Sequence, residues 1–263
     1  MDVGITKFNA SGSSLLYSTY LGGSGNETPH SIVCAPNGEL YVYGVTSSVN
    51  FPMAGQSFDN TFNGGPYQLQ NSLEFNGSDI YIARLNPSGT ALLSSTFVGG
   101  SSTDGLNSAS LFYNYGDQFR GEIVLDDNQN IYVSSTTTSS NFPTTNPFQN
   151  SLNGTQDAII FKMNPGLSQM IWGSYFGGSG VESGNSITVG DNGSIYVAGG
   201  TTSSSLAISG GHDLTFNGGS SDGYALRINA ANGSMQSGTY MGQSEYDQTY
   251  FYKHLLSQMY LKM

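Results

Sequence analysis

Apolar residues along the chain fall in short runs, many of them alternating with polar residues, and this pattern predicts β-strands. One part of the chain shows it clearly, in the runs Ser31–Ala35, Glu39–Gly44, Asp79–Asn86 and Ala91–Val98. Asn-Gly and Ser-Gly turn signals stand between several of these runs. Strands of this length joined by such turns predict antiparallel hairpins.

The same order of four runs, which we call a, b, c and d, returns along the chain. Equivalent runs are Gly121–Leu125, Asn130–Ser134, Asp157–Asn164 and Gln169–Phe176, and then Ser186–Val189, Ser194–Gly199, Asp222–Asn229 and Ser234–Met241. An initial c–d pair precedes them, so the units are residues 2–23, 24–100, 101–178 and 179–243, with 244–263 as a degenerate a–b pair or a frayed tail. A long repeat of this kind indicates stacked supersecondary units.

Sequential four-stranded antiparallel units predict an all-β fold, namely a β-propeller that forms a single domain over residues 1–263. If the last a–b pair completes the blade begun by the first c–d pair, the result is a closed four-bladed ring without exposed sheet edges. Otherwise the chain is a fragment of a larger propeller. Lys253, Leu255 and Leu256 depart from the repeat in the tail, which favours a helical or frayed end almost equally.

The balance of charge disfavours several classes of partner. The chain has 7 Lys and Arg against 18 Asp and Glu, a net charge of -11. Four of the cations, Lys7, Arg84, Lys162 and Arg227, share one repeat position, which leaves few to form a basic patch. We therefore expect no binding to nucleic acid or to an anionic membrane surface.

A single cysteine excludes an internal disulfide. Cys34 aligns with Leu125 and Val189, so we expect a buried thiol that acts as a small apolar residue. No apolar run approaches the ~20 residues that a membrane helix needs, so we expect no membrane insertion. No secretory leader is seen ahead of the repeats, which suggests a mature or excised fragment.

One acidic residue recurs four positions after the second glycine of each Gly-Gly pair, counting Gln243 as the fourth. These residues are Glu27, Asp104, Glu182 and Asp247. In a propeller they would trace a ring about the axis that could hold a hard cation such as calcium. The alternative, which needs no cofactor, is that each carboxylate accepts backbone hydrogen bonds in its own loop.

An aromatic insertion interrupts the repeat at residues 101–116. It carries Leu111, Phe112, Tyr113 and Tyr115, which are a candidate contact surface for a partner. The alternative is that these side chains fold back on the nearest blade.

Three motifs together resemble the bacterial seven-bladed β-propeller repeat (SBBP-type repeat). They are Tyr-Leu-Gly-Gly-Ser-Gly-Asn-Glu at 20–27, Gly-Ser-Ile-Tyr-Val-Ala-Gly at 193–199 and Thr-Ser-Ser-Val-Asn-Phe-Pro at 46–52. The resemblance covers residues 2 to about 250. It implies a large secreted or surface-displayed bacterial protein, in some cases associated with gliding, and it supplies no catalytic residues.

Three functions follow as hypotheses. The first is a non-enzymatic extracellular or cell-surface scaffold that contacts a protein or a surface glycan and is associated with adhesion or gliding. The second is a glycan-binding, lectin-like propeller, since Tyr, Asn and Asp suit sugars and repetition gives multivalency. The third is a propeller-based lyase or hydrolase, which would need clustered His, Arg and carboxylates. In the sequence His30, His212 and His254 are scattered, and no nucleophile or phosphate-loop motif is found.

Overall fold

A computed structural model describes residues 1–114 and 116–250, and in this part of the chain the fold is all-β. Apart from strands, it has the short 3-10 turns η1 (Ala109–Leu111) and η2 (Asp117–Phe119). None of the described segments is a helix long and apolar enough to cross a membrane. The prediction of an all-β chain built from four-stranded antiparallel units is confirmed.

Three four-stranded antiparallel sheets make up most of the described chain. The first sheet contains β3 (Glu27–Cys34), β4 (Leu40–Thr46), β7 (Asp79–Leu85) and β8 (Leu92–Val98). The second contains β9 (Glu122–Leu125), β10 (Ile131–Thr137), β11 (Asp157–Met163) and β12 (Met170–Phe176). The third contains β13 (Glu182–Val189), β14 (Ser194–Thr201), β15 (Asp222–Asn229) and β16 (Met235–Met241).

Two hairpins complete the described structure. Strands β1 (Val3–Phe8) and β2 (Leu15–Leu21) form a half-sheet that corresponds to the c and d strands of a unit. Strands β5 (Tyr67–Gln70) and β6 (Leu73–Asn76) form a small separate hairpin within the insertion between β4 and β7. In the described residues β1 pairs only with β2, so no strand closes the array into a ring.

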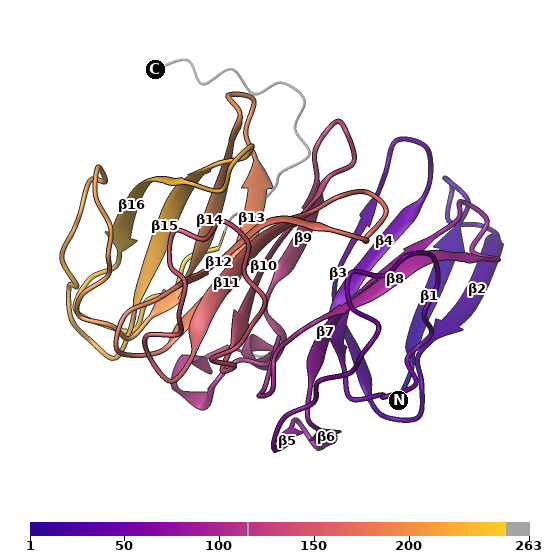
Figure 1. Ribbon diagram of the computed structural model, residues 1–263, viewed down its shortest axis with the longest axis horizontal. Coiled ribbons are helices and arrows are strands. Elements are labelled where there is room, and N and C mark those ends of the chain that lie inside the picture. The colour runs from indigo at the N-terminus through magenta and orange to yellow at the C-terminus, as the bar shows by residue number, and fades with distance from the viewer. Residues whose placement is uncertain (115, 251–263) are drawn as a thin grey trace.

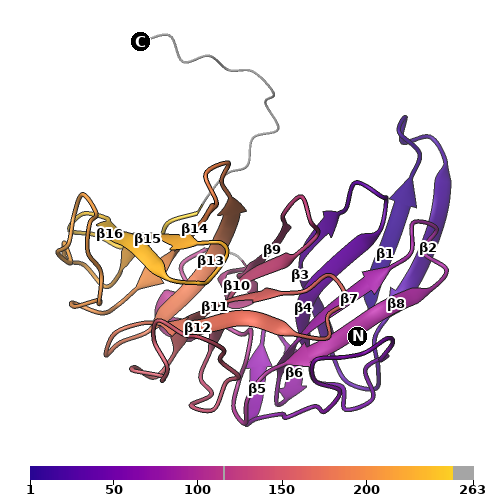
Figure 2. The ribbon, with the colours of Figure 1, turned by 45° about the horizontal axis from the view of Figure 1, so that its top comes forward.

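The sheets follow one another in an arc. Figures 1 and 2 show the half-sheet at one end, the third sheet at the other, and the first and second sheets between them. The first strand of each full sheet lies on the inner side, where β9 contacts both β3 and β13. The inner strands of separate units are thereby brought together.

An apolar layer fills each space between neighbouring sheets. On β7, Ile80 and Ile82 face the second sheet and share a cluster with Ile159 of β11. On the opposite face of β7, Tyr81 shares a cluster with Val3 of the half-sheet. Strand side chains alternate between the two faces, and because both faces are covered β4, β7, β10 and β11 in the middle of the arc are buried almost throughout.

The repeated Gly-Gly pairs pack against polar side chains at the joints between sheets. A Cβ on Gly99 would lie 2.5 Å from Asp79 Oδ1 and 3.0 Å from Asp104 Oδ2. A Cβ on Gly100 would lie 2.6 Å from Ser139 Cβ and 2.7 Å from Asn141 Oδ1. Only glycine fits such close approaches, which explains why the Gly-Gly, acidic and Ser-x-Asn positions recur together.

Three of the four repeated basic residues link their unit to the next. Lys7 Nζ donates to the carbonyl oxygen of Pro87 at 3.3 Å, and Arg84 Nη1 donates to that of Pro165 at 3.3 Å. Lys162 Nζ makes the third hydrogen bond of this series and donates to the carbonyl oxygen of Ala230 at 3.1 Å. Each acceptor directly follows the asparagine that ends a c strand in the next unit. Equivalent letters in the sequence therefore occupy equivalent places in the fold.

The prediction of a buried Cys34 is wrong, because the thiol is exposed. Its counterparts Leu125 and Val189 are half-buried and pack against the preceding sheet. Cys34 faces the half-sheet, which has no inner strands to cover it. The predicted tail irregularities at Lys253, Leu255 and Leu256 lie outside the described residues.

Candidate functional site

The inner strands of all three sheets meet at a pocket of about 740 Å³. Strand β3 contributes His30 and Ser31, β9 contributes Glu122, and β13 contributes Asn185 and Ser186. Two loops add the remaining walls, with the lining residues Asn114, Phe119, Arg120, Gly121, Gln248, Thr249 and Tyr250. Units that are far apart in sequence thus share one concave site, as small-ligand sites usually require.

One wall is the insertion loop, held in shape by the buried carboxylate of Asp117. Arg120 donates to Asp117 Oδ1 through Nε at 2.9 Å and Nη2 at 2.7 Å. The backbone amides of Tyr113 and Asn114 donate to Oδ2 at 2.9 and 2.6 Å. Burial alone would raise the pKa of Asp117, but these hydrogen bonds from Asn114, Tyr113 and Arg120 bring it below its ordinary value.

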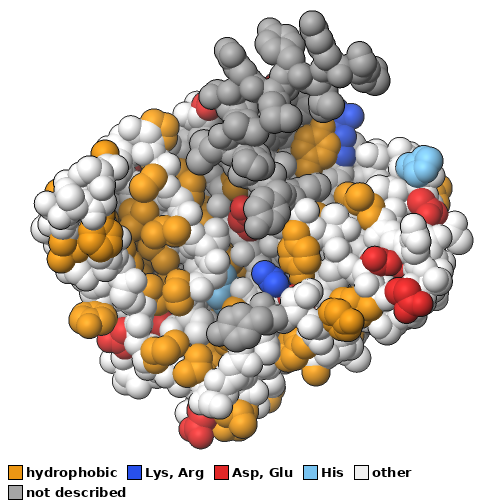
Figure 3. All heavy atoms as spheres, turned by 180° about the vertical axis from the view of Figure 1, so that it is seen from behind, with side chains coloured by type: hydrophobic (Ala, Val, Ile, Leu, Met, Phe, Trp, Pro, Cys, Tyr) orange, Lys and Arg blue, Asp and Glu red, His pale blue; other side chains and the backbone are white. Residues whose placement is uncertain are grey.

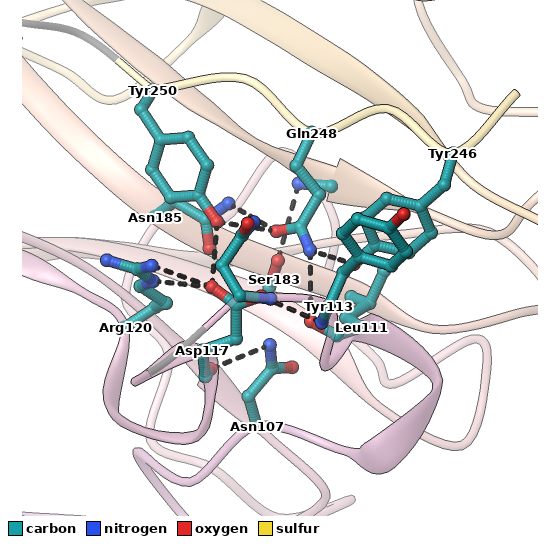
Figure 4. A network of polar contacts seen from close by, with 12 residues as sticks. Asn107, Leu111, Tyr113, Asp117, Arg120, Ser183, Asn185, Tyr246, Gln248 and Tyr250 are labelled. Atoms are coloured by element: carbon teal, nitrogen blue, oxygen red, sulfur yellow. Dashed lines mark hydrogen bonds and ion pairs between the residues drawn. The ribbon is translucent and has the colours of Figure 1, made fainter.

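The adjoining wall is the segment 244–250, which is joined to the insertion loop by the contacts drawn in Figure 4. Gln248 Nε2 donates to Leu111 O at 2.9 Å, and Gln248 Oε1 accepts from Asn185 Nδ2 at 2.9 Å. Tyr250 Oη lies 3.2 Å from Asp117 Oδ1, and its ring lies 4.9 Å from the Arg120 guanidinium. These contacts fix the two loops beside the pocket.

Aromatic rings stand at the rim and the floor of the site. Tyr113 is 74% exposed and stacks on Tyr246, with ring centroids 4.6 Å apart and an angle of 22°. His30 lies edge-on to Tyr43 at 5.4 Å and beside Phe119 at 5.7 Å. Burial lowers the pKa of His30 to about 3, so its imidazole is neutral near pH 7.

The pocket offers mainly neutral polar groups. Asn, Gln and Ser side chains can both donate and accept hydrogen bonds, and Arg120 adds donors. The carboxylate of Glu122 accepts from the Ile187 amide at 2.9 Å through Oε2. Figure 3 shows hydrophobic side chains scattered over one face of the molecule and only a few charged ones.

The aromatic residues predicted as a contact surface separate into different environments. Leu111 is buried and Phe112 half-buried, whereas Tyr113 is exposed beside the pocket. Tyr115 lies outside the described residues. In the described part of the insertion, Asn114 therefore lines the pocket and Tyr113 lies exposed beside it.

The four predicted ring carboxylates lie one at each joint, and each has partners in its own loops. Asp104 accepts hydrogen bonds from the Thr137 and Ser139 hydroxyls and from the Gly100 amide. Glu27 and Glu182 accept from matching hydroxyls and glycine amides, and Asp247 accepts from the Gln243 amide at 2.7 Å. Among residues 1–114 and 116–250, no three His, Cys, Asp or Glu side chains are arranged to hold a metal ion.

Sequence reasoning missed Arg120, Asn185, Gln248 and Tyr250. One signal was present, because Arg120 is a basic residue outside the position shared by Lys7, Arg84, Lys162 and Arg227. Nothing in the local sequence of Asn185 or Gln248 marks it as a site residue. Only the packing of three units brings them together.

Comparison with known proteins gives little further information. No protein-family model matches the chain, and no curated protein matches it. A solved structure of a mutant GH43 protein, BlXynB from Bacillus licheniformis, is similar with a TM-score of 0.34 and 13% identity. The match covers 84% of this chain and 34% of the other chain.

Two predictions conflict with this comparison and are not retained. The first is that the chain is a non-enzymatic scaffold, and the second is that it is not an enzyme. The similar structure is that of a GH43 glycoside hydrolase. At this TM-score the likeness supplies no reaction, substrate or residue role for the present chain.

Proposed function

We propose that the chain binds a carbohydrate in the pocket formed by β3, β9 and β13. The observation that supports this most directly is the set of polar groups, most of them neutral, that converge from three inner strands and two loops. A pocket volume of about 740 Å³ suits a ligand of a few sugar rings.

The chemistry of the lining favours hydroxyl-rich ligands. A sugar hydroxyl both donates and accepts hydrogen bonds. The side chains of Ser31, Asn114 and Ser186 can likewise donate and accept. The rings of Phe119 and Tyr250, which line the pocket, offer an apolar surface for a sugar face. A net charge of -11 disfavours strongly anionic polymers.

The finer description of the fold belongs to the same proposal. We take the full sheets to be blades of a β-propeller, because four-stranded antiparallel sheets follow one another with their first strands innermost. The motif resemblance to the bacterial propeller repeat supports a secreted or cell-surface setting, where glycans are abundant.

A glycan array followed by titration calorimetry tests the proposal. We expect saturable binding of an uncharged oligosaccharide. Asn114→Ala should weaken it by about tenfold, because one good hydrogen bond is worth roughly that factor. Ser31→Trp should abolish it by filling the pocket.

Asn128→Ala is the matched control, since Asn128 is exposed in a turn between β9 and β10. It should bind like the unaltered chain. Binding that Ser31→Trp leaves intact would place the ligand elsewhere and overturn the proposal.

A further inference from the structure

The half-sheet leaves uncovered a face that is covered in every full sheet. In the register of the c and d strands, Tyr20 corresponds to Phe97, Tyr175 and Tyr240. These three rings are at most 2% exposed, whereas Tyr20 is 81% exposed. Phe8 is likewise exposed where its counterpart in the first sheet is buried. The half-sheet therefore presents an apolar face that elsewhere packs on the preceding sheet.

Among residues 1–114 and 116–250, nothing covers the complementary face of the third sheet at the other end of the arc. Met241 corresponds to Leu21, Val98 and Phe176, which all pack toward a following sheet. Those three side chains are at most 5% exposed, whereas Met241 is 47% exposed. On the neighbouring strand, Ala225 of β15 is half-buried.

A hydrogen-bond series is also incomplete at these two ends. In three units the repeated basic residue donates to a carbonyl of the following unit, at Pro87, Pro165 and Ala230. Arg227 is the fourth basic residue, and its Nε donates to Ser194 Oγ at 3.0 Å within its own sheet. Within residues 1–114 and 116–250 no backbone carbonyl accepts from it. The fourth acceptor position is Ala10, which follows Asn9 at the end of β1 and is exposed.

Figures 1 and 2 place the half-sheet and β15–β16 at opposite ends of the arc, so in the described part of the chain these two faces lie apart. We infer that the chain associates head to tail, with the half-sheet of one copy seated on the β15–β16 face of the next. Arg227 of one copy then donates to the Ala10 carbonyl of the next, and Tyr20 packs on Ala225 and Met241. A heterologous joint of this kind closes into a ring or continues as a fibre.

Two single-sided variants test this arrangement by sedimentation or light scattering. Tyr20→Lys disables the half-sheet face, and Met241→Lys disables the β15–β16 face. Both side chains are substantially exposed, so neither change should disturb the fold. The unaltered chain should form assemblies of several copies, each variant alone should be monomeric, and an equimolar mixture should form a complex of two chains through its one intact joint.

Tyr67→Lys is the matched control, because Tyr67 is an exposed tyrosine on β5, away from both faces. It should assemble like the unaltered chain. An unaltered chain that stays monomeric up to its solubility limit overturns the inference. So does a Met241→Lys variant that still dimerises alone, because half-sheets would then pair with each other.

Discussion

At the scale of single residues, the repeat preserves a pair of carboxylates at each joint between sheets. Asp79 and Asp104 both lie against Gly99, and Asp157 and Glu182 lie against Gly177 in the same way. Burial, with a smaller contribution from the nearby Asp104 charge, raises the pKa of Asp79 to about 8. Asp104 keeps three hydrogen-bond donors, whereas Asp79 Oδ1 has no partner among the described residues, so Asp79 is the better place for a proton.

The first prediction concerns pH. In the unfolded chain Asp79 ionises near its ordinary pKa of 3.8, whereas in the folded chain it ionises near 8. The folded state therefore binds the proton more tightly than the unfolded state. The stabilisation that comes from protonated Asp79 is complete below about pH 4 and is lost as the pH rises toward 8. In thermal unfolding measured from pH 4 to pH 9, the Asp79→Asn variant should lose less stability with rising pH than the unaltered chain loses.

Asp127→Asn serves as the control for the change in net charge, because Asp127 is exposed in a turn. If Asp79→Asn and Asp127→Asn shift the pH profile equally, Asp79 has no special part in it.

The second prediction concerns the glycine between a carboxylate pair. A Cβ at Gly177 would lie 2.4 Å from Asp157 Oδ1 and 2.5 Å from Glu182 Oε2. Gly177→Ala should lower the free energy of unfolding by about 1–3 kcal/mol, the usual cost of overpacking. Gly4→Ala is the control, because no atom lies within 4 Å of its Cβ position. Equal stability of the two variants in urea would contradict this account.

At the scale of strands, the same register position has different surroundings in different units. Ile32 of β3 and Ile123 of β9 both pair with the third residue of the neighbouring strand. Ile123 is 2% exposed because the first sheet covers it, whereas Ile32 is 57% exposed because the half-sheet has no inner strands. The strand pattern predicted both positions as apolar, and neighbouring sheets decide which is buried.

The third prediction follows from this matched pair. Ile123→Ala should cost about 2–5 kcal/mol, since it leaves a cavity between two sheets. Ile32→Ala should cost under about 0.5 kcal/mol, as is usual at an exposed site. Chemical denaturation with matched m-values measures both. Similar losses would mean that something covers Ile32.

At the scale of the whole molecule, stability should fall toward the half-sheet. Strand β1 has a partner on one side only, whereas its counterpart β7 is paired on both sides. Hydrogen exchange in dilute solution should therefore be faster at Gly4 and Thr6 than at Tyr81 and Ala83, the equivalent residues. Uniform protection of all four amides at low concentration would contradict this expectation.

The whole molecule also shows how far the candidate site could be predicted. The insertion at 101–116 interrupts the repeat and can therefore be recognised in the sequence, and its Asn114 lines the pocket. Asn185 and Gln248 were not recognised, because their role depends on which loops face each other across the inner strands. The carboxylates that repeat most regularly serve the joints between sheets.

The sequence alone determined the strands, their antiparallel order and the equivalence of the units, because these depend on alternation, turn residues and a repeat that are local along the chain. Tertiary structure decided the rest. The exposure of Cys34, Ile32 and Tyr20, and the convergence of Arg120 with Gln248, depend on which sheet lies alongside. A repeat specifies what each unit presents to its neighbours, but whether a neighbour is there to cover it is a property of the assembled arc.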